Sequence, residues 1–460
     1  MNPAPDTNHQ VMADPAATRT LRTVDLLILS TGTFTLGVDG FVLSGLLPQV
    51  AASLHVSAST AGQLTTLFAL VYAIGSPVIA AIAGAWDRRS LLTAGMAVFI
   101  AGMIVQATGP DFAAVAAGRV LAALGAAGYQ ATAYSTAGIL SDDTHRARSL
   151  AIVAGGSSVA LVAGLPFGIL VGQAWGWRAA MWVLVVLAVA SALAVWLLPP
   201  ARAPRLSLRE RGRALADPRV LGILAGTVTV LTPVFLIIAY LPAVMRASGT
   251  WIVVAMLAYG AGQVTGTILV PRLIRRHSAR TALICGACGI TAVTAILTVT
   301  RTLDATAAVT MAALGFSAGL TIVPQQHRLF ATVPKLAPVA VGLNGSGIYI
   351  ATALGAAAGG LALAIGGSAA PTVTAAVIGL LAVVVATTAV RRAPANCSWE
   401  FLRTTRSRCP SPAMYGWVSQ VVTGAFSWPP RVDSWPLPAI ARMPPQRRLS
   451  AGVGVDASSE

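Results

Sequence analysis

Hydrophobic positions fall into continuous blocks, each close to the roughly 20 residues that a helix needs to cross a bilayer, and polar positions lie mostly between the blocks. The blocks are unbroken rather than alternating, which favours helices over a closed barrel, the other structure that spans lipid. We therefore predict twelve transmembrane helices, near residues 24–47, 60–83, 91–109, 112–136, 149–172, 179–198, 219–243, 251–271, 281–300, 305–325, 338–364 and 371–390.

The composition agrees with a membrane protein. Only 10% of the 460 residues are charged while 56% are apolar, whereas a soluble domain carries about 25% charged residues. The formal charge of +16 would suit a nucleic-acid partner if it were gathered on one face. The arginines instead lie in short loops between the apolar blocks, so we predict a lipid bilayer and no nucleic acid as partner.

The orientation follows from the arginines and lysines, which gather in cytoplasmic loops. With the N-terminus inside, the outer loops hold only Arg178, Arg246 and Arg301, and both termini are cytoplasmic. We therefore expect a multi-pass protein of a bacterial inner (cell) membrane. The inner loops then hold Arg88, Arg89, Arg146, Arg148, Arg202 to Arg219, Arg272, Arg275, Arg276, Arg280, Arg328 and Lys335.

The longest internal loop divides the spans six and six, and the halves resemble each other. Gly75 precedes the pair Arg88-Arg89 by the same number of residues as Gly262 precedes Arg275-Arg276, each pair closing the second span of its half. Internal repeats are typical of transporters. We predict an all-α membrane protein with two six-helix pseudo-symmetric bundles. Its parts are a polar tail (1–23), a first bundle (24–198), a cytoplasmic linker (199–218), a second bundle (219–390) and a C-terminal tail (391–460).

The C-terminal tail differs from the rest in composition, being rich in proline, tryptophan and arginine without periodicity. Two interpretations stay open: a disordered cytoplasmic tail, or an out-of-frame extension of a gene that once ended near the last span.

Two charged residues lie inside spans, where each costs roughly 2.5–3.5 kcal/mol on insertion scales. Asp39 lies in the first span and Arg119 in the fourth. A partly desolvated carboxylate is disfavoured in its ionised form, as a group that binds and releases a proton requires. Asp39 is therefore the candidate for proton coupling. The alternative is a structural acid paired with a neighbouring helix, and Arg119 could equally tune the carboxylate or hold helix packing.

Two further segments carry motifs. Gly84, Asp87, Arg88 and Arg89 lie in the loop after the second span, where Asp can cap a helix and the arginines suit the cytoplasmic interface. In the fifth span, proline removes a backbone hydrogen bond and small residues allow close helix contact, which predicts a hinge or a tight interface. The residues of this second motif are Gly164, Pro166, Gly168 and Gly172.

Together these elements resemble the major facilitator superfamily, and more narrowly its twelve-span drug:proton antiporters. The resemblance covers residues 24–390. It rests on the loop at Gly84–Arg89, the run Arg119-x5-Gly125-x2-Gly128, and the span-five glycines. Leu46-Leu47-Pro48, Gly176-Trp177-Arg178, Gln325-Gln326-His327-Arg328 and Leu343-Asn344 resemble its sugar-efflux and chloramphenicol-exporter branch.

The resemblance implies roles for individual residues. Asp39 would be the acid linked to substrate and proton, Arg119 the proton-linked arginine, and Asp87 the loop residue that stabilises the outward-facing state. The chain departs from the family pattern in four places. Ser90 directly follows Arg89, span five reads Gly-Leu-Pro, the second-half loop lacks an aspartate, and the connection around 245–250 is short.

Other polar residues in the spans are candidates to line a cavity, although each could equally form a hydrogen bond between helices. Cys285 and Cys288 are expected to be inert. No phosphate-binding loop, metal-ligand spacing or nucleophile arrangement occurs in the sequence, so we expect no enzyme activity, metal or cofactor. The candidate lining residues are Gln130, Tyr134, Tyr240, Gln263, Asn344 and Tyr349.

The sequence therefore predicts a monomeric secondary transporter in which inward protons drive a small drug-like or antibiotic molecule outward by alternating access. A potential of 100 mV supplies about 2.3 kcal/mol per charge. Two alternatives stay open: a sugar or metabolite exporter of the same fold, and a membrane scaffold or sensor that transports nothing.

Overall fold

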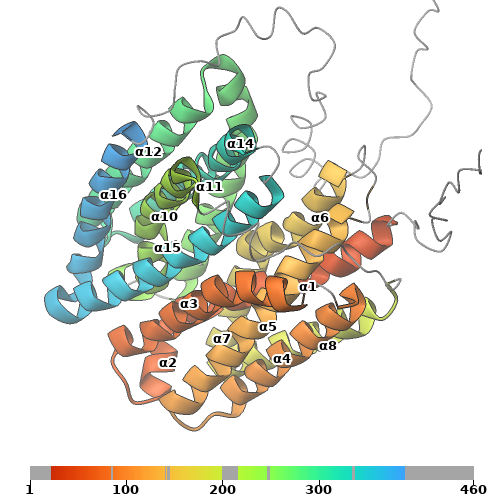
Figure 1. Ribbon diagram of the computed structural model, residues 1–460. Coiled ribbons are helices and arrows are strands. Elements are labelled where there is room, and N and C mark those ends of the chain that lie inside the picture. Colours follow the sequence, from red (N-terminus) through yellow and green to blue (C-terminus); the bar gives the residue numbers. More distant parts are fainter. Residues whose placement is uncertain are drawn as a thin grey trace, which may run out of the picture. The chain divides into compact units, whose positions relative to one another are not determined.

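The structure is a computed structural model that describes residues 22–83, 86–139, 141, 146–198, 216–245, 249–333 and 337–388. The regular elements of these residues are all helical, and the described residues fall within a single compact unit (Figure 1). The helices are α1 (Thr23–Gly45), α2 (Leu47–Ser53), α3 (Ala58–Ile82), α4 (Arg88–Thr108), α5 (Phe112–Ile139), α6 (Arg146–Val159), η2 (Ala160–Gly164), α7 (Leu165–Trp175), α8 (Trp177–Val195), α10 (Pro218–Met245), α11 (Gly249–Arg276), α12 (Ala279–Thr300), α13 (Asp304–Gly319), α14 (Ile322–Thr332), α15 (Ala337–Gly366), η4 (Gly367–Ala369) and α16 (Ala370–Thr388).

The predicted spans are present as helices. Eleven stretches of the described chain are long and apolar enough to cross a membrane, and the last of them, Gly342–Thr388, is 47 residues long. That stretch contains both α15 and α16, which the short turn η4 separates, so each of the twelve predicted spans corresponds to helical structure. The prediction of an all-α membrane fold is confirmed.

Three spans are interrupted in ways that the hydrophobic pattern did not predict. The first span ends at Gly45 and continues, after Leu46, as the short helix α2. The fifth span contains a π-helical turn, η2, between α6 and α7. The tenth span divides into α13 and α14 around Leu320 and Thr321. A π turn inside an α-helix is rare and often marks a functional position.

Glycines allow α4 and α5 to approach closely. A Cβ atom on Gly102 would collide with the backbone of Ala122, and one on Gly125 would collide with the backbone of Phe99. No larger residue fits at these positions without moving a helix, so the two helices form a tight backbone-to-backbone contact, as small residues allow in membranes.

The arginine pairs lie differently from the prediction. Arg275 and Arg276 do close the second span of their half, in the last turn of α11. Arg88 and Arg89 instead begin the third span, because Asp87 caps α4 immediately before them, so this part of the prediction is wrong. Gly75 and Gly262, the glycines that precede the two arginine pairs, do occupy corresponding places. Gly75 faces Leu124 and Ala127 of α5, and Gly262 faces Ala312 and Phe316 of α13. Each of these two helices, α5 and α13, is the fourth span of its half of the chain.

Helices of the first six spans also contact helices of the last six. The most extensive of these contacts joins α3 to α15, and α1 contacts α10. Near the start of α3, the Ser59 hydroxyl donates to the Gly360 carbonyl of α15 at 2.7 Å. The Tyr240 hydroxyl of α10 donates to the Ser59 carbonyl at 3.4 Å. The domain boundaries predicted above remain a prediction, and most of both tails and of the linker lie outside the described residues.

Candidate functional site

The two charged residues predicted inside the spans form an ion pair. Arg119 Nη1 of α5 donates to Asp39 Oδ1 of α1 at 2.9 Å, and both side chains are 0% exposed. The same nitrogen lies 3.4 Å from the Asp39 backbone carbonyl. A charge buried in this way is tolerated because it is paired and hydrogen-bonded.

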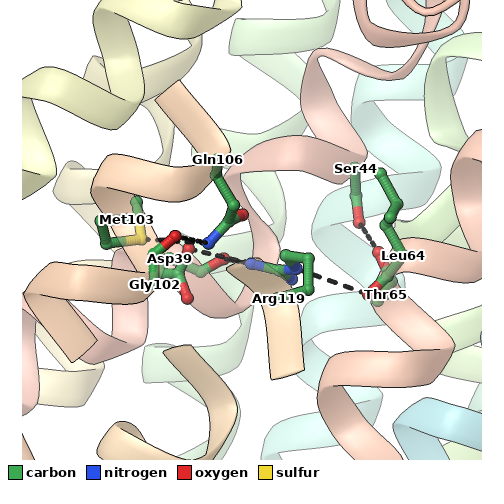
Figure 2. A network of polar contacts seen from close by, with 8 residues as sticks. All are labelled: Asp39, Ser44, Leu64, Thr65, Gly102, Met103, Gln106 and Arg119. Carbon is green, nitrogen blue, oxygen red and sulfur yellow. Dashed lines mark hydrogen bonds and ion pairs between the residues drawn. The ribbon is translucent and has the colours of Figure 1, made fainter. Parts of the chain in front are cut away.

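The guanidinium of Arg119 also reaches α3. Its Nε donates to the Leu64 carbonyl at 3.4 Å, and its central carbon lies 4.3 Å from the centre of the Phe68 ring. A cation over an aromatic face is an attractive contact, strongest where water is excluded. Arg119 therefore joins α1, α3 and α5 at one point, as Figure 2 shows.

Three polar atoms at or near this ion pair have no hydrogen-bond partner among the residues that the structure describes. They are Asp39 Oδ2, Arg119 Nη2 and Gln106 Oε1, all buried. Gln106 belongs to α4, and its side chain lies against Gly118, the residue before Arg119. Its amide nitrogen makes only long contacts, to the Gly102 carbonyl at 3.3 Å and the Met103 sulfur at 3.4 Å. A buried group without a partner is costly, so such groups call for an explanation.

Two of the predicted lining residues, Gln130 and Tyr349, contact a group of aromatic side chains next to Arg119. The Tyr72 hydroxyl of α3 donates to Gln130 Oε1 of α5 at 2.9 Å. The Tyr72 ring stacks on Tyr349 of α15, with ring centres 3.7 Å apart. Phe68 lies 6.3 Å from Tyr72 and 6.4 Å from Tyr349, centre to centre. The site therefore contains residues of α3, α5 and α15.

Sequence reasoning missed Phe68, Tyr72 and Gln106. Phe68 gave no signal, because a phenylalanine in an apolar span looks like any other apolar residue. Tyr72 and Gln106 are polar residues inside spans, which is the criterion that selected Gln130 and Tyr134. Applied to every span, the same criterion would have found both.

The glycines of the span-five motif face α1, the helix that carries Asp39. Gly164 lies against Val38, Gly168 against Val42 and Gly172 against Leu46. Pro166 lies in the first turn of α7, directly after the π turn. The helix is continuous here, since Gly164 is helical and the Leu165 amide donates to the Ala160 carbonyl, so Pro166 removes one backbone hydrogen bond beside the π turn. The motif therefore forms a close contact between the fifth span and α1, next to an irregular helical turn.

The remaining predicted lining residues lie elsewhere. Asn344 of α15 is fully buried, accepts a hydrogen bond from the Thr227 hydroxyl at 2.7 Å, and has no partner for its side-chain nitrogen. Gln263 lies in the close contact between α11 and α13, where its backbone meets Gly315 and Gly319. Tyr134 of α5 is partly buried.

The loop after the second span has a structural role in this conformation. The Asp87 carboxylate accepts from the Ser90 amide at 3.1 Å and so caps α4. Arg88 is buried, and the guanidinium of Arg89 lies 4.3 Å from the ring of Trp196, at the end of α8. Gly84 lies outside the described residues.

Helices long and apolar enough to cross a membrane, with a buried ion pair between α1 and α5, make the described part of the chain a polytopic membrane protein of the transporter class. A model of the Major Facilitator Superfamily matches residues 29–335, and the chain belongs to this family. It is therefore a transporter and not an enzyme.

Individual relatives narrow the comparison. A chloramphenicol resistance protein of Streptomyces lividans is 36% identical over 275 residues, which are 57% of this chain and 69% of the relative. A chloramphenicol efflux pump of Mycobacterium tuberculosis is 30% identical over 262 residues, 55% of this chain and 63% of the relative. A crystal structure of a variant of the nucleoside transporter NupG has a TM-score of 0.64 at 9% identity, covering 80% of this chain and 99% of the other. That likeness concerns the fold alone.

Proposed function

We propose that this transporter exports a small drug-like molecule across a bacterial inner membrane in exchange for protons, and that Asp39 carries the exchanged proton. The observation that carries the proposal is the fully buried Asp39–Arg119 ion pair inside the spans. An intramembrane acid of this kind points to ion or proton transport. The two relatives named for chloramphenicol resistance and efflux favour an antibiotic as the cargo.

The geometry offers a site for the proton. Asp39 Oδ2 has no hydrogen-bond partner within the described part of the chain, whereas Oδ1 holds Arg119. A proton can bind Oδ2 without first breaking the bond at Oδ1. Protonation then removes the charge that held the guanidinium, because a neutral carboxyl accepts a weaker hydrogen bond than a carboxylate. The link between α1 and α5 loosens when the proton binds and tightens when it leaves.

The contact between α1 and the fifth span would carry this change further. The glycines of that span fit against Val38 and Val42, on either side of Asp39 in α1. A shift of α1 therefore cannot occur without a shift of the fifth span at the π turn. We propose alternating access as the result, with both termini in the cytoplasm and the protein acting as a monomer.

Transport into vesicles tests this proposal. The purified chain is reconstituted into proteoliposomes, a pH gradient is applied, and the uptake of radiolabelled chloramphenicol is measured for wild type, Asp39→Asn and Asp39→Glu. We expect gradient-driven uptake by wild type, uptake within about twofold of protein-free vesicles for Asp39→Asn, and partial recovery for Asp39→Glu, which keeps an ionisable acid. Undiminished gradient-driven uptake by Asp39→Asn would remove the coupling role of this residue.

A further inference from the structure

Two stacked aromatic pairs join the first six spans to the last six. Tyr72 of α3 stacks on Tyr349 of α15, with centres 3.7 Å apart and ring planes inclined by 25°. Phe41 of α1 stacks on Phe235 of α10, with centres 5.6 Å apart and planes inclined by 8°. Each pair takes one ring from each half of the chain, so any movement between the halves at this level changes the stacking.

The Tyr72–Tyr349 pair has the features of a ligand site. Tyr349, Gln130 and Tyr134 are only partly buried, although Tyr349 and Gln130 lie well inside their helices. Tyr72 keeps its hydroxyl on Gln130, which fixes its ring, while the face of its ring meets Tyr349. Partly exposed polar groups at this depth, on helices that face one another, mark a place where another molecule can enter.

We propose that Tyr72 and Tyr349 bind a planar aromatic ring of the exported molecule between them. This inference rests on the proposed export function and names the class of substrate. Ring faces 3.7 Å apart are in van der Waals contact. A flat ring that enters when the halves separate by about 3.5 Å replaces one protein stack with two protein–ligand stacks. In the absence of substrate, the two tyrosines cover each other.

The surroundings indicate a neutral substrate. Among the described residues, Asp39 and Arg119 form a fully buried ion pair inside the spans, and each neutralises the other. No net charge therefore favours an ion at this level. Gln130 and Tyr134 offer hydrogen-bonding groups beside the stacked rings. The class of substrate is a neutral molecule with one planar aromatic ring and hydrogen-bonding substituents.

Phe68 connects this site to the proposed proton site. One side of its ring contacts the guanidinium of Arg119 at 4.3 Å, and the ring also lies near both tyrosines. A ring inserted between the tyrosines displaces at least one of them, and Phe68 must move with it. Occupancy of the aromatic site therefore alters the contact that helps to hold Arg119 in place.

A binding experiment with matched ligands and matched variants tests the inference. The purified full-length chain is titrated with chloramphenicol, phenyl β-D-glucoside and cyclohexyl β-D-glucoside, and the dissociation constant of each is measured by equilibrium dialysis. Each glucoside carries a six-membered carbon ring on the same sugar, and only the phenyl ring is flat. The variants are Tyr349→Leu and Tyr349→Phe, with Phe235→Leu as the control that removes a ring from the other stacked pair.

We expect Tyr349→Leu to bind the two aromatic ligands about fivefold to tenfold more weakly, in keeping with the strength of aromatic stacking. Tyr349→Phe keeps the ring and is expected to stay within about twofold of wild type, as is Phe235→Leu. Wild type should prefer the phenyl to the cyclohexyl glucoside.

Equal affinities of the Leu and Phe variants for chloramphenicol, or equal affinities of wild type for the two glucosides, would overturn the aromatic site and leave the export function standing. If wild type bound none of the ligands and failed to transport chloramphenicol, the proposed function itself would fall, and this inference with it.

Discussion

Asp39 and Arg119 each make the burial of the other tolerable, and this mutual dependence can be measured. Removing one partner of a buried ion pair leaves the other charge without compensation and costs about 3–5 kcal/mol, whereas removing both is far less costly. We therefore expect Arg119→Met to lower the free energy of unfolding by about this amount, and the double variant Asp39→Asn with Arg119→Met to recover much of the loss. Thermal unfolding of wild type and the two variants in one detergent measures the difference. A double variant less stable than Arg119→Met would contradict the pairing.

At the same scale, the sequence predicted the residues of the pair, whereas their contact was only one of the alternatives that it left open. Asp39 and Arg119 were selected because charges inside spans are costly. Their pairing depends on how α1 and α5 are rotated and shifted against each other, which no pattern within either span records. The same limit applies to Tyr72 and Gln130, whose hydrogen bond joins α3 and α5.

Among the elements, the contact between α7 and α1 gives a sharp comparison between neighbouring residues. Gly168 lies against Val42 of α1, whereas Phe167 is 58% exposed on the outer side of the same helix. We expect Gly168→Leu to reduce the rate of chloramphenicol transport in proteoliposomes at least tenfold, because the added side chain separates α7 from α1. Phe167→Leu should leave the rate within about twofold. Equal rates for the two variants would show that this contact has no part in transport.

The contact between α4 and α5 makes a prediction about stability. A Cβ atom at Gly125 meets the backbone of Phe99, which cannot move aside as a flexible side chain can, whereas a Cβ atom at Gly155 meets nothing within 4 Å. We expect Gly125→Ala to destabilise the protein by about 1–3 kcal/mol. Gly155→Ala should be neutral or slightly stabilising, because alanine is the better helix former. The thermal unfolding midpoints of the two variants test this prediction. Equal midpoints would mean that α4 and α5 can move apart at no cost in stability.

Helical spans were the most predictable feature of these elements, because length and hydrophobicity alone determine whether a segment can cross a bilayer. The interruptions within the spans were less predictable from the sequence. Pro166 signalled an irregular fifth span, but not the π turn at Ala160–Gly164. Arg88 and Arg89 were predicted to close the second span but begin the third, because Asp87 caps α4 immediately before them.

For the whole molecule, contacts between the halves at the start of α3 are expected to break during transport. Ser59 of α3 and Gly360 of α15 lie within hydrogen-bond distance, at the end that the arginine pattern predicts to face outside. In a cysteine-free background, a disulfide between Ser59→Cys and Gly360→Cys should stop chloramphenicol transport, and a reducing agent should restore it. Ser59→Cys alone serves as the control. Full transport by the oxidised double variant would show that these ends need not separate.

The claim on which the molecule's proposed mechanism depends is that substrate and proton exchange at Asp39. The most direct measurement is the proton released when chloramphenicol is added to the purified chain in weakly buffered solution, followed with a pH indicator dye. At a pH low enough for Asp39 to carry its proton before the ligand is added, we predict proton release by wild type, with an amplitude that saturates as ligand binding does, and none by Asp39→Asn. Release of the same size from Asp39→Asn, or none from wild type that binds the ligand, would contradict the account.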